Sequence, residues 1–270
     1  MPLSDTQKDI LRKLVKDGQV KNQNLMKELQ ISPSSLYYNI DSLIGLCIQR
    51  TRGGLELASK SIHKAKSAFY EKLETDRREK EDLAEIIIKS DTIDYGDTLL
   101  IDCGTTNYII IERLIEHGKK GLNIISVNPY VLKRLLDYPE IGHIRAVGGT
   151  LNETTGAIFG PMTVQCIKEI KQIGAVIIGI DAVDQNGELG IVNEFEINQK
   201  KIMLEKAKKI LVPITQSKLD RAVSHSIGNM GELKSHKTIS MFISGSPSHT
   251  NKVLTKLRST LGDENIFFTN

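Results

Sequence analysis

Residues 96–107, which read GDTLLIDCGTTN, decide the fold of most of this chain. Residues 98–101 are apolar or β-branched and predict a short buried strand, and Gly104 then begins a turn into a segment with helical periodicity. A strand that is apolar on both faces is typical of a parallel sheet with helices on both sides. The stretch therefore predicts one strand-turn-helix unit of an α/β domain.

The same alternation continues through the rest of the chain. Strand-like segments are expected at residues 122–128, 143–149, 175–181, 209–214 and 238–244, and helix-like segments at 107–116, 130–136, 162–170 and 196–209. This order predicts an α/β domain with a mainly parallel sheet over residues 81–270.

Residues 1–58 predict a separate, small α+β domain. Three short helices are expected there, because Ser4 with Gln7 has the spacing of a capping box and Ser32-Pro33 is a strong helix start. The segment CIQRTRGGLEL at 47–57 predicts a hairpin. Three helices and a hairpin are the pattern of a winged helix-turn-helix. The highly charged residues 59–80 predict a helical linker.

A winged helix-turn-helix domain would read duplex DNA with its third helix in the major groove and would meet phosphates on the hairpin. Residues 1–70 carry 11 Lys and Arg against 6 Asp and Glu, which favours this interpretation. The alternatives are that the hydroxyl groups form a plain solvated face, or that the domain contacts protein. The candidate DNA-binding residues are Ser34, Ser35, Tyr37, Tyr38, Arg50 and Arg52.

Composition gives the broad class of protein. A hydrophobic fraction of 40% and a net charge of +3 are typical of a globular chain and argue against a disordered one. The chain begins with no apolar leader and has no stretch that could cross a membrane, so a cytoplasmic location is expected. The three cysteines and six histidines have no ligand spacing, so no metal site is expected.

Polar residues and glycines follow several of the predicted parallel strands. The carboxyl ends of such strands meet at one edge of the sheet, where α/β domains bind ligands, and a turn into a helix can hold an anion. Lys200 and Glu196 are added from the neighbouring helix. The candidate ligand-binding residues are Asp102, Gly104, Thr105, Thr106, Asn107, Asn128, Gly148, Gly149, Asp181, Glu196, Lys200 and Lys218.

Several motifs in one order resemble those of DeoR-type transcriptional regulators. The matching text is GDTLLIDCGTTN at 96–107, SVNPYVL at 126–132, VGGTLN at 147–152 with FGP at 159–161, IGIDAVDQNGELG at 178–190, EINQKKIM at 196–203 and the step Gln216-Ser217-Lys218. Where that family usually reads T-I-R-R-D-L in its recognition helix, residues 35–40 read SLYYNI.

The resemblance implies a winged helix-turn-helix followed by a sugar-phosphate sensor domain of the ribose-phosphate isomerase and CoA transferase fold. It implies a repressor of sugar-metabolism genes that binds double-stranded operator DNA, needs no cofactor and leaves DNA when a phosphorylated sugar binds. Because one winged helix contacts too few phosphates for tight binding, a homodimer or tetramer is expected. The alternative is an isomerase-like enzyme that uses Asp181, Asp184 and Lys218. Such an enzyme needs a carboxylate base near its substrate, and Glu196 is the nearest candidate.

Overall fold

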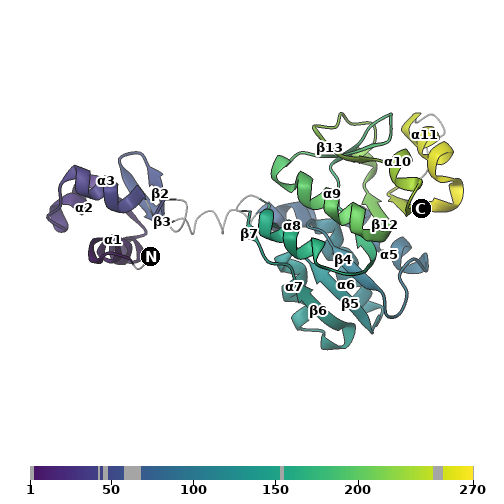
Figure 1. The fold of residues 1–270 in the computed structure, drawn as a ribbon, viewed down its shortest axis with the longest axis horizontal. Coiled ribbons are helices and arrows are strands. Elements are labelled where there is room, and N and C mark those ends of the chain that lie inside the picture. Colours follow the sequence, from purple (N-terminus) through teal and green to yellow (C-terminus); the bar gives the residue numbers. More distant parts are fainter. Residues whose placement is uncertain are drawn as a thin grey trace. The chain divides into compact units, whose positions relative to one another are not determined.

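The computed structural model describes residues 3–41, 43–44, 48–57, 68–152, 155–245 and 252–269. The chain forms two compact units, Met1–Ser67 and Ala68–Asn270 (Figure 1). Each unit has its own apolar core, so each is described by itself.

The first unit packs helices on a small antiparallel sheet. Its core consists of apolar residues from every helix and from the sheet, including Ile10, Leu25, Leu36 and Leu55, all without exposed surface. The sheet has the strand order β1-β3-β2. The elements are α1 (Asp5–Asp17), β1 (Gln19–Lys21), α2 (Asn22–Glu28), α3 (Pro33–Asp41), β2 (Ile48–Thr51) and β3 (Gly54–Leu57).

The second unit is built on a seven-stranded sheet with the order β15-β14-β12-β9-β4-β5-β6, in which every pair of neighbours is parallel. The predicted α/β domain with a mainly parallel sheet is therefore confirmed. The strands are β4 (Thr98–Ile101), β5 (Leu122–Ser126), β6 (Gly142–Ala146), β9 (Ile173–Ile177), β12 (Ala207–Ile214), β14 (Thr238–Ile243) and β15 (Ile266–Phe268).

Helices cover both faces of this sheet (Figure 1). Leu99 and Ile101 pack with α5 (Arg77–Lys89), α6 (Thr105–Glu116) and α7 (Pro129–Leu136) on one face. Leu100 packs on the other face in a cluster that contains residues of α8 (Pro161–Lys168), α9 (Ile197–Lys206), α10 (Met230–Lys234) and α11 (Lys252–Leu261). Burial on both faces explains why β4 is apolar at consecutive positions.

Short elements extend the carboxyl edge of the sheet, where its parallel strands end. A second, antiparallel sheet has the order β10-β11-β13, and a hairpin pairs β7 with β8. These strands are β10 (Ala182–Val183), β11 (Glu188–Ile191), β13 (His225–Asn229), β7 (Thr150–Leu151) and β8 (Ile158–Phe159). The described residues also form four short 3-10 helices, namely η1 (Pro139–Ile141) directly before β6, η2 (Glu194–Glu196), η3 (Gln216–Lys218) and η4 (Asp263–Asn265) directly before β15. The helix η3 carries Lys218.

The linker predicted at 59–80 differs from the structure. Residues 59–67 lie outside the described residues, whereas residues 68–80 belong to the second unit. Residues 68–74 are helical, and Phe69 and Leu73, four positions apart, are buried in its core. Two apolar residues on one helical face suffice for docking, and the many charges around them obscured this pattern in the sequence.

Candidate functional site

A cavity lies beside the carboxyl ends of β9 and β12. Its volume is about 280 Å³, and three charged residues line it, namely Asp181, Lys218 and Arg221. The other lining residues are Ala182, Ile191, Val192, Ala222 and Ser224. Sequence analysis selected Asp181 and Lys218 but missed Arg221, whose only signal is its position three residues after Lys218.

Lys218 is held at the rim of this cavity by a backbone carbonyl. Its Nζ donates to Ile180 O at 2.7 Å, and no carboxylate of the described residues pairs with it within 4.0 Å. Burial lowers the pKa of Lys218, and the charges of Lys200, Lys72 and Arg221 lower it further, against the opposing effect of Asp181. A bound anion would relieve this repulsion and stabilise the charged amine.

Asp181 lines the same cavity. Its Oδ2 accepts a hydrogen bond from Val192 N at 2.9 Å, and its own amide donates to Gly190 O. Asp181 is exposed, so one carboxylate oxygen is free to meet a ligand. The cavity therefore offers one carboxylate acceptor and two cationic donors.

A buried ion pair lies below the carboxyl edge. Asp102 has no exposed surface, and its Oδ2 accepts from Gly179 N at 2.9 Å and from Lys200 Nζ. Lys200 also donates to Gly179 O at 2.9 Å. Burial alone would lower the pKa of Lys200, but Asp102 and Glu196 reverse the effect and raise it. This pair joins the ends of β4 and β9 to α9.

Glu196 completes this buried group. Its Oε2 lies 3.7 Å from Lys200 Nζ, and its Oε1 accepts from Asn193 Nδ2 at 2.9 Å. Burial raises the pKa of Glu196, and Lys200 only partly opposes that shift. The sequence selected Asp102, Glu196 and Lys200 as ligand-binding residues, and in the structure they pair with one another in the interior.

The predicted anion-binding turn begins α6. Gly104 has φ +135°, a conformation that favours glycine, and Thr105 and Thr106 are half-buried. Asn107 is buried, and its Nδ2 donates to the carbonyls of Asp102 and Ile177 at 3.0 and 3.2 Å. The threonines are accessible to a ligand, whereas the Asn107 side chain fixes the turn to β9.

Asn128 supports the same turn from β5. It is fully buried, its Oδ1 accepts from the amides of Tyr130 and Val131 at the start of α7, and its Nδ2 donates to Gly104 O at 3.3 Å. The side chain therefore positions Gly104.

Asp102 Oδ1 and Asn107 Oδ1 are buried without a hydrogen-bond partner among the described residues, which is uncommon for such atoms.

Gly148 and Gly149 do not line the cavity. Both are exposed, and Gly148 O accepts from Thr163 Oγ1 in α8 at 2.9 Å. A Cβ at Gly149 would meet Thr163 Oγ1 at 2.0 Å, so close packing against α8 explains the glycine. Cys103 lies inside the site, where burial raises the pKa of its thiol well above the usual value. A thiol of this kind is unreactive.

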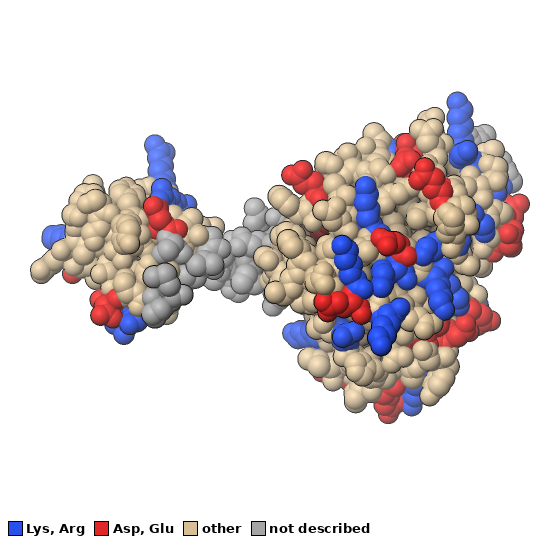
Figure 2. Space-filling view, viewed as in Figure 1, with Lys and Arg blue, Asp and Glu red and all other residues tan. Residues whose placement is uncertain are grey.

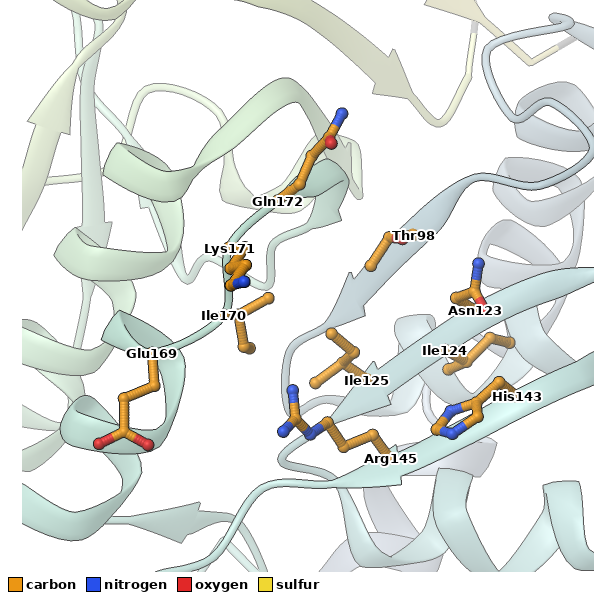
Figure 3. Close-up of a pocket in the computed structure, with 10 residues that line it drawn as sticks. All are labelled: Thr98, Asn123, Ile124, Ile125, His143, Arg145, Glu169, Ile170, Lys171 and Gln172. Atoms are coloured by element: carbon orange, nitrogen blue, oxygen red, sulfur yellow. The ribbon is translucent and has the colours of Figure 1, made fainter.

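A larger cavity of about 620 Å³ lies elsewhere, between β4, β5 and β6 and the chain that follows α8 (Figure 3). Its lining includes Asn123, His143, Arg145 and Lys171 but no residue that the sequence selected. Figure 3 shows Glu169 pointing away from the strands, so the polar groups that line this cavity do not converge on one point. Size alone therefore does not make this cavity the better candidate.

Lysine and arginine side chains also gather on the surface over α9 and β12 (Figure 2). By sequence, Lys201 belongs to α9, Lys208 to β12 and Lys168 to the end of α8; all three are exposed, and Lys206 donates to Lys168 O at 3.0 Å. Because α8 and α9 end where β9 and β12 begin, Lys168 and Lys208 lie at the amino edge of the sheet. They are therefore separate from the cavity beside Lys218.

In the first unit, the candidate DNA-binding residues lie on α3 and on the β2–β3 hairpin. Tyr37 and Tyr38 are 44% and 82% exposed, Ser34 is exposed and Ser35 is half-buried. Arg52 is exposed in the turn between β2 and β3. Arg50 lies over the Tyr37 ring at 5.6 Å and pairs with Asp41 at 2.7 Å. Aromatic and cationic groups thus share one surface of α3 and β2.

Metal binding and membrane crossing find no support in the part of the chain that the structure describes. No group of three or more His, Cys, Asp or Glu could hold a metal ion, and no helix is long and apolar enough to cross a membrane.

The second unit is an α/β domain with a polar cavity at the carboxyl edge of its parallel sheet, and the comparisons with known proteins give its family. Residues 75–239, more than half of the chain, match the family described as the DeoR C terminal sensor domain. The chain belongs to this family. It is a DeoR-type transcriptional regulator rather than an enzyme, as the sequence predicts.

Individual relatives agree with this assignment. The chain is 27% identical to the glycerol-3-phosphate regulon repressor of Escherichia coli (strain K12), over 83% of this chain and 84% of that protein. It is 21% identical to the L-fucose operon activator of the same organism, over 84% and 91%. Among solved structures, ribose 5 phosphate isomerase A from Neisseria gonorrhoeae is similar with 19% identity over 52% of each chain and a TM-score of 0.38.

Proposed function

We propose that this regulator binds operator DNA through residues 1–58, folded as a winged helix-turn-helix, and is released by a phosphorylated sugar bound at the carboxyl edge of the second unit. One observation carries the effector assignment. Asp181, Lys218 and Arg221 line one cavity at the carboxyl edge of the sheet, the edge at which Thr105 and Thr106 begin α6. Cations suit a phosphate, and a carboxylate suits sugar hydroxyls.

The effector would be held by groups of two kinds. The phosphate would lie between the amides and hydroxyls of residues 104–107 and the cationic groups of Lys218 and Arg221. Asp181 would accept from hydroxyl groups and so discriminate between sugars. Gly104, Asp102, Asn107 and Asn128 would act by holding the turn in place, and Glu196 and Lys200 by fixing its base.

Calorimetry against glycerol 3-phosphate and a panel of pentose and hexose phosphates tests the effector site. We expect at least one compound to bind below the millimolar range and Lys218→Ala to weaken it at least tenfold, because a charge-assisted contact contributes about 1.5–3 kcal/mol. Lys208→Ala is the matched control, since Lys208 is exposed at the other end of β12. Equal binding by Lys218→Ala and the parent would refute the assignment.

The DNA interface would use bases and phosphates differently. Ser34, Ser35, Tyr37 and Tyr38 would meet base edges, whereas Arg50 and Arg52 would meet phosphates. Selection of genomic fragments by the full-length protein should enrich one sequence, with binding that weakens steeply as salt rises. Tyr37→Ala should change the preferred sequence, and Arg52→Ala should weaken all sequences alike. If no sequence is enriched, the first unit contacts protein instead.

The remaining parts of the proposal concern assembly and location. Paired half-sites require a homodimer or tetramer, with the contact supplied by the second unit. We propose repression because the glycerol-3-phosphate regulon repressor is a relative of this chain. Another relative, the L-fucose operon activator, is named as an activator, so transcription of the regulated genes should be measured with and without the protein. A regulator of this kind works in the cytoplasm and needs no cofactor besides its effector.

A further inference from the structure

Residues 68–80, called here the entry segment, begin the second unit at the point where the first unit is joined to it. Phe69 stacks on the Tyr130 ring with centroids 3.7 Å apart. Tyr130 follows Asn128 and Pro129 at the start of α7, directly after the carboxyl end of β5. The entry segment is therefore packed beside the turn that positions Gly104.

The entry segment touches the candidate effector site at two places. Thr105 Oγ1 donates to Lys72 O at 3.5 Å. Ser244 Oγ donates to Glu79 at 2.5 Å and accepts from the amide of Gln216 at 2.8 Å, two residues before Lys218. The entry segment thus contacts the turn at Thr105 directly and is linked to the loop of Lys218 through Ser244.

Lys80 is a buried cation in this segment. It is 7% exposed, and its Nζ donates to Thr75 O at 2.5 Å and to Lys72 O. These are its two acceptors among the described residues, whereas an ammonium group has three hydrogens. Burial lowers the pKa of Lys80, and the charges of Lys218 and Lys72 add to this effect against Asp76 and Glu74. Lys72 O thus accepts from both Lys80 and Thr105, which places Lys80 beside the turn that begins α6.

We propose that Lys80 is a further effector-binding residue, and that an anion held between Lys80 and Lys218 draws the entry segment against the crevice. This inference rests on the proposed function of the crevice and adds how its occupancy reaches the first unit. Both amines lack a carboxylate partner within 4.0 Å among the ion pairs of the described residues. A phosphate would supply one acceptor group to both.

Two contacts decide whether a bound phosphate holds the entry segment more tightly or releases it. The Thr105 hydroxyl has one hydrogen, so donating it to a phosphate breaks its contact with Lys72 O. At 3.5 Å that contact is at the long limit for an O–H···O bond and is weak. Bonds from an ammonium group to a phosphate are about twice as strong as neutral ones. The new bonds therefore outweigh the lost one, and the segment is held more tightly.

Coupling between effector binding and DNA binding needs only that the effector binds one arrangement of the entry segment more tightly than the other. A ligand shifts an equilibrium by its differential affinity, and a phosphate that binds the closed entry segment better favours that arrangement. Residue 68 is the first residue of the second unit. Holding the entry segment more tightly therefore changes the part of the second unit that directly follows the first unit in the chain.

Hydrogen exchange on the full-length parent protein tests this without any variant. The probe is the tightest-binding sugar phosphate of the calorimetric panel, with inorganic phosphate as an ion control. We expect the amides of residues 68–80 and 104–107 to exchange several-fold more slowly with the sugar phosphate bound. A different result would overturn the inference: exchange becomes slower at residues 104–107, while at residues 68–80 it stays the same or becomes faster. The effector site itself would still be supported by that result.

Lys80→Met tests the residue itself, with Lys89→Met as the matched control. Lys89 lies on the same helix with a side chain that is 72% exposed. We expect Lys80→Met to bind the compound about tenfold more weakly and, at saturation, to lose the slower exchange at 68–80, whereas Lys89→Met behaves like the parent. Parental affinity in Lys80→Met overturns the inference. If the parent binds no compound, the effector assignment fails and the inference fails with it.

Discussion

Arg50 already has partners in the first unit, and they limit its use on DNA. It pairs with Asp41 at 2.7 Å, and the side chains are 53% and 65% exposed. An exposed pair of this kind contributes only about 0–1 kcal/mol, so a phosphate can compete for Arg50. We expect Asp41→Asn to strengthen binding to any duplex several-fold and to steepen its salt dependence, measured by fluorescence titration at several salt concentrations.

Asp9→Asn is the control for this change. Asp9 pairs with Arg12 on α1 at 2.8 Å, so the variant changes the net charge by the same amount at another place. An equal gain in both variants would mean that net charge alone, not the release of Arg50, strengthens binding.

Glu196 makes the stability of the second unit depend on pH. Burial raises its pKa above the usual 4.5, so the folded state holds this proton more tightly than the unfolded state does. The stabilisation is fully present below pH 4.5 and is lost as pH rises through the folded pKa. We expect Glu196→Gln to have a larger free energy of unfolding than the parent at pH 7, with the difference vanishing near pH 4.5.

Urea unfolding of both proteins at these two pH values checks the sign. Lys200 at 3.7 Å opposes the shift, but it keeps Asp102 as a partner when Glu196 is replaced. A variant that is less stable than the parent at pH 7 would show that the ion pair outweighs burial.

At the scale of elements, β4 and β9 meet so closely after their last residues that only glycine fits at position 179. A Cβ there would lie 2.7 Å from Cys103 O and 3.4 Å from Asp102 Oδ2. We expect Gly179→Ala to lower the free energy of unfolding by about 1–3 kcal/mol, because the backbone must shift. Gly174→Ala on β9 is the control, with closest contacts of 3.2–3.4 Å, and should cost less in chemical denaturation.

The strand pattern of the second unit could be predicted because burial on both faces leaves a continuous apolar signal. The helix predicted at 107–116 is α6, Thr105–Glu116, and the strand predicted at 209–214 lies within β12, Ala207–Ile214. The antiparallel strands β10, β11 and β13 escaped prediction. Two to five residues give too short a pattern to separate a strand from a loop.

The candidate site was harder to predict than the fold. Asp181 and Lys218 could be chosen because they follow strands, and both line the cavity. The ion pair of Asp102 with Lys200 joins residues 98 positions apart, so only the folded chain reveals that these side chains satisfy each other. Arg221 lies in a loop whose path depends on β13, and no local pattern marks it.

At the scale of the whole molecule, one small unit contacts too few phosphates for tight and specific binding. We expect the protein to form a dimer or tetramer with at least twice the 30.1 kDa mass of the chain. Light scattering coupled to size exclusion at micromolar concentration measures this. A mass of one chain with unimpaired operator binding would contradict the expectation.

The order of strands in the sheet also sets an order of events during translation. Leu99 of β4 pairs with Ala175 of β9, which lies 76 positions later in the chain. At about 5–20 residues per second, β4 waits about 4–15 s on the ribosome for its central neighbour. The first unit pairs β1 with β3 over fewer than 40 positions and can fold meanwhile. A nascent chain therefore acquires its first unit before its second unit can close around an effector.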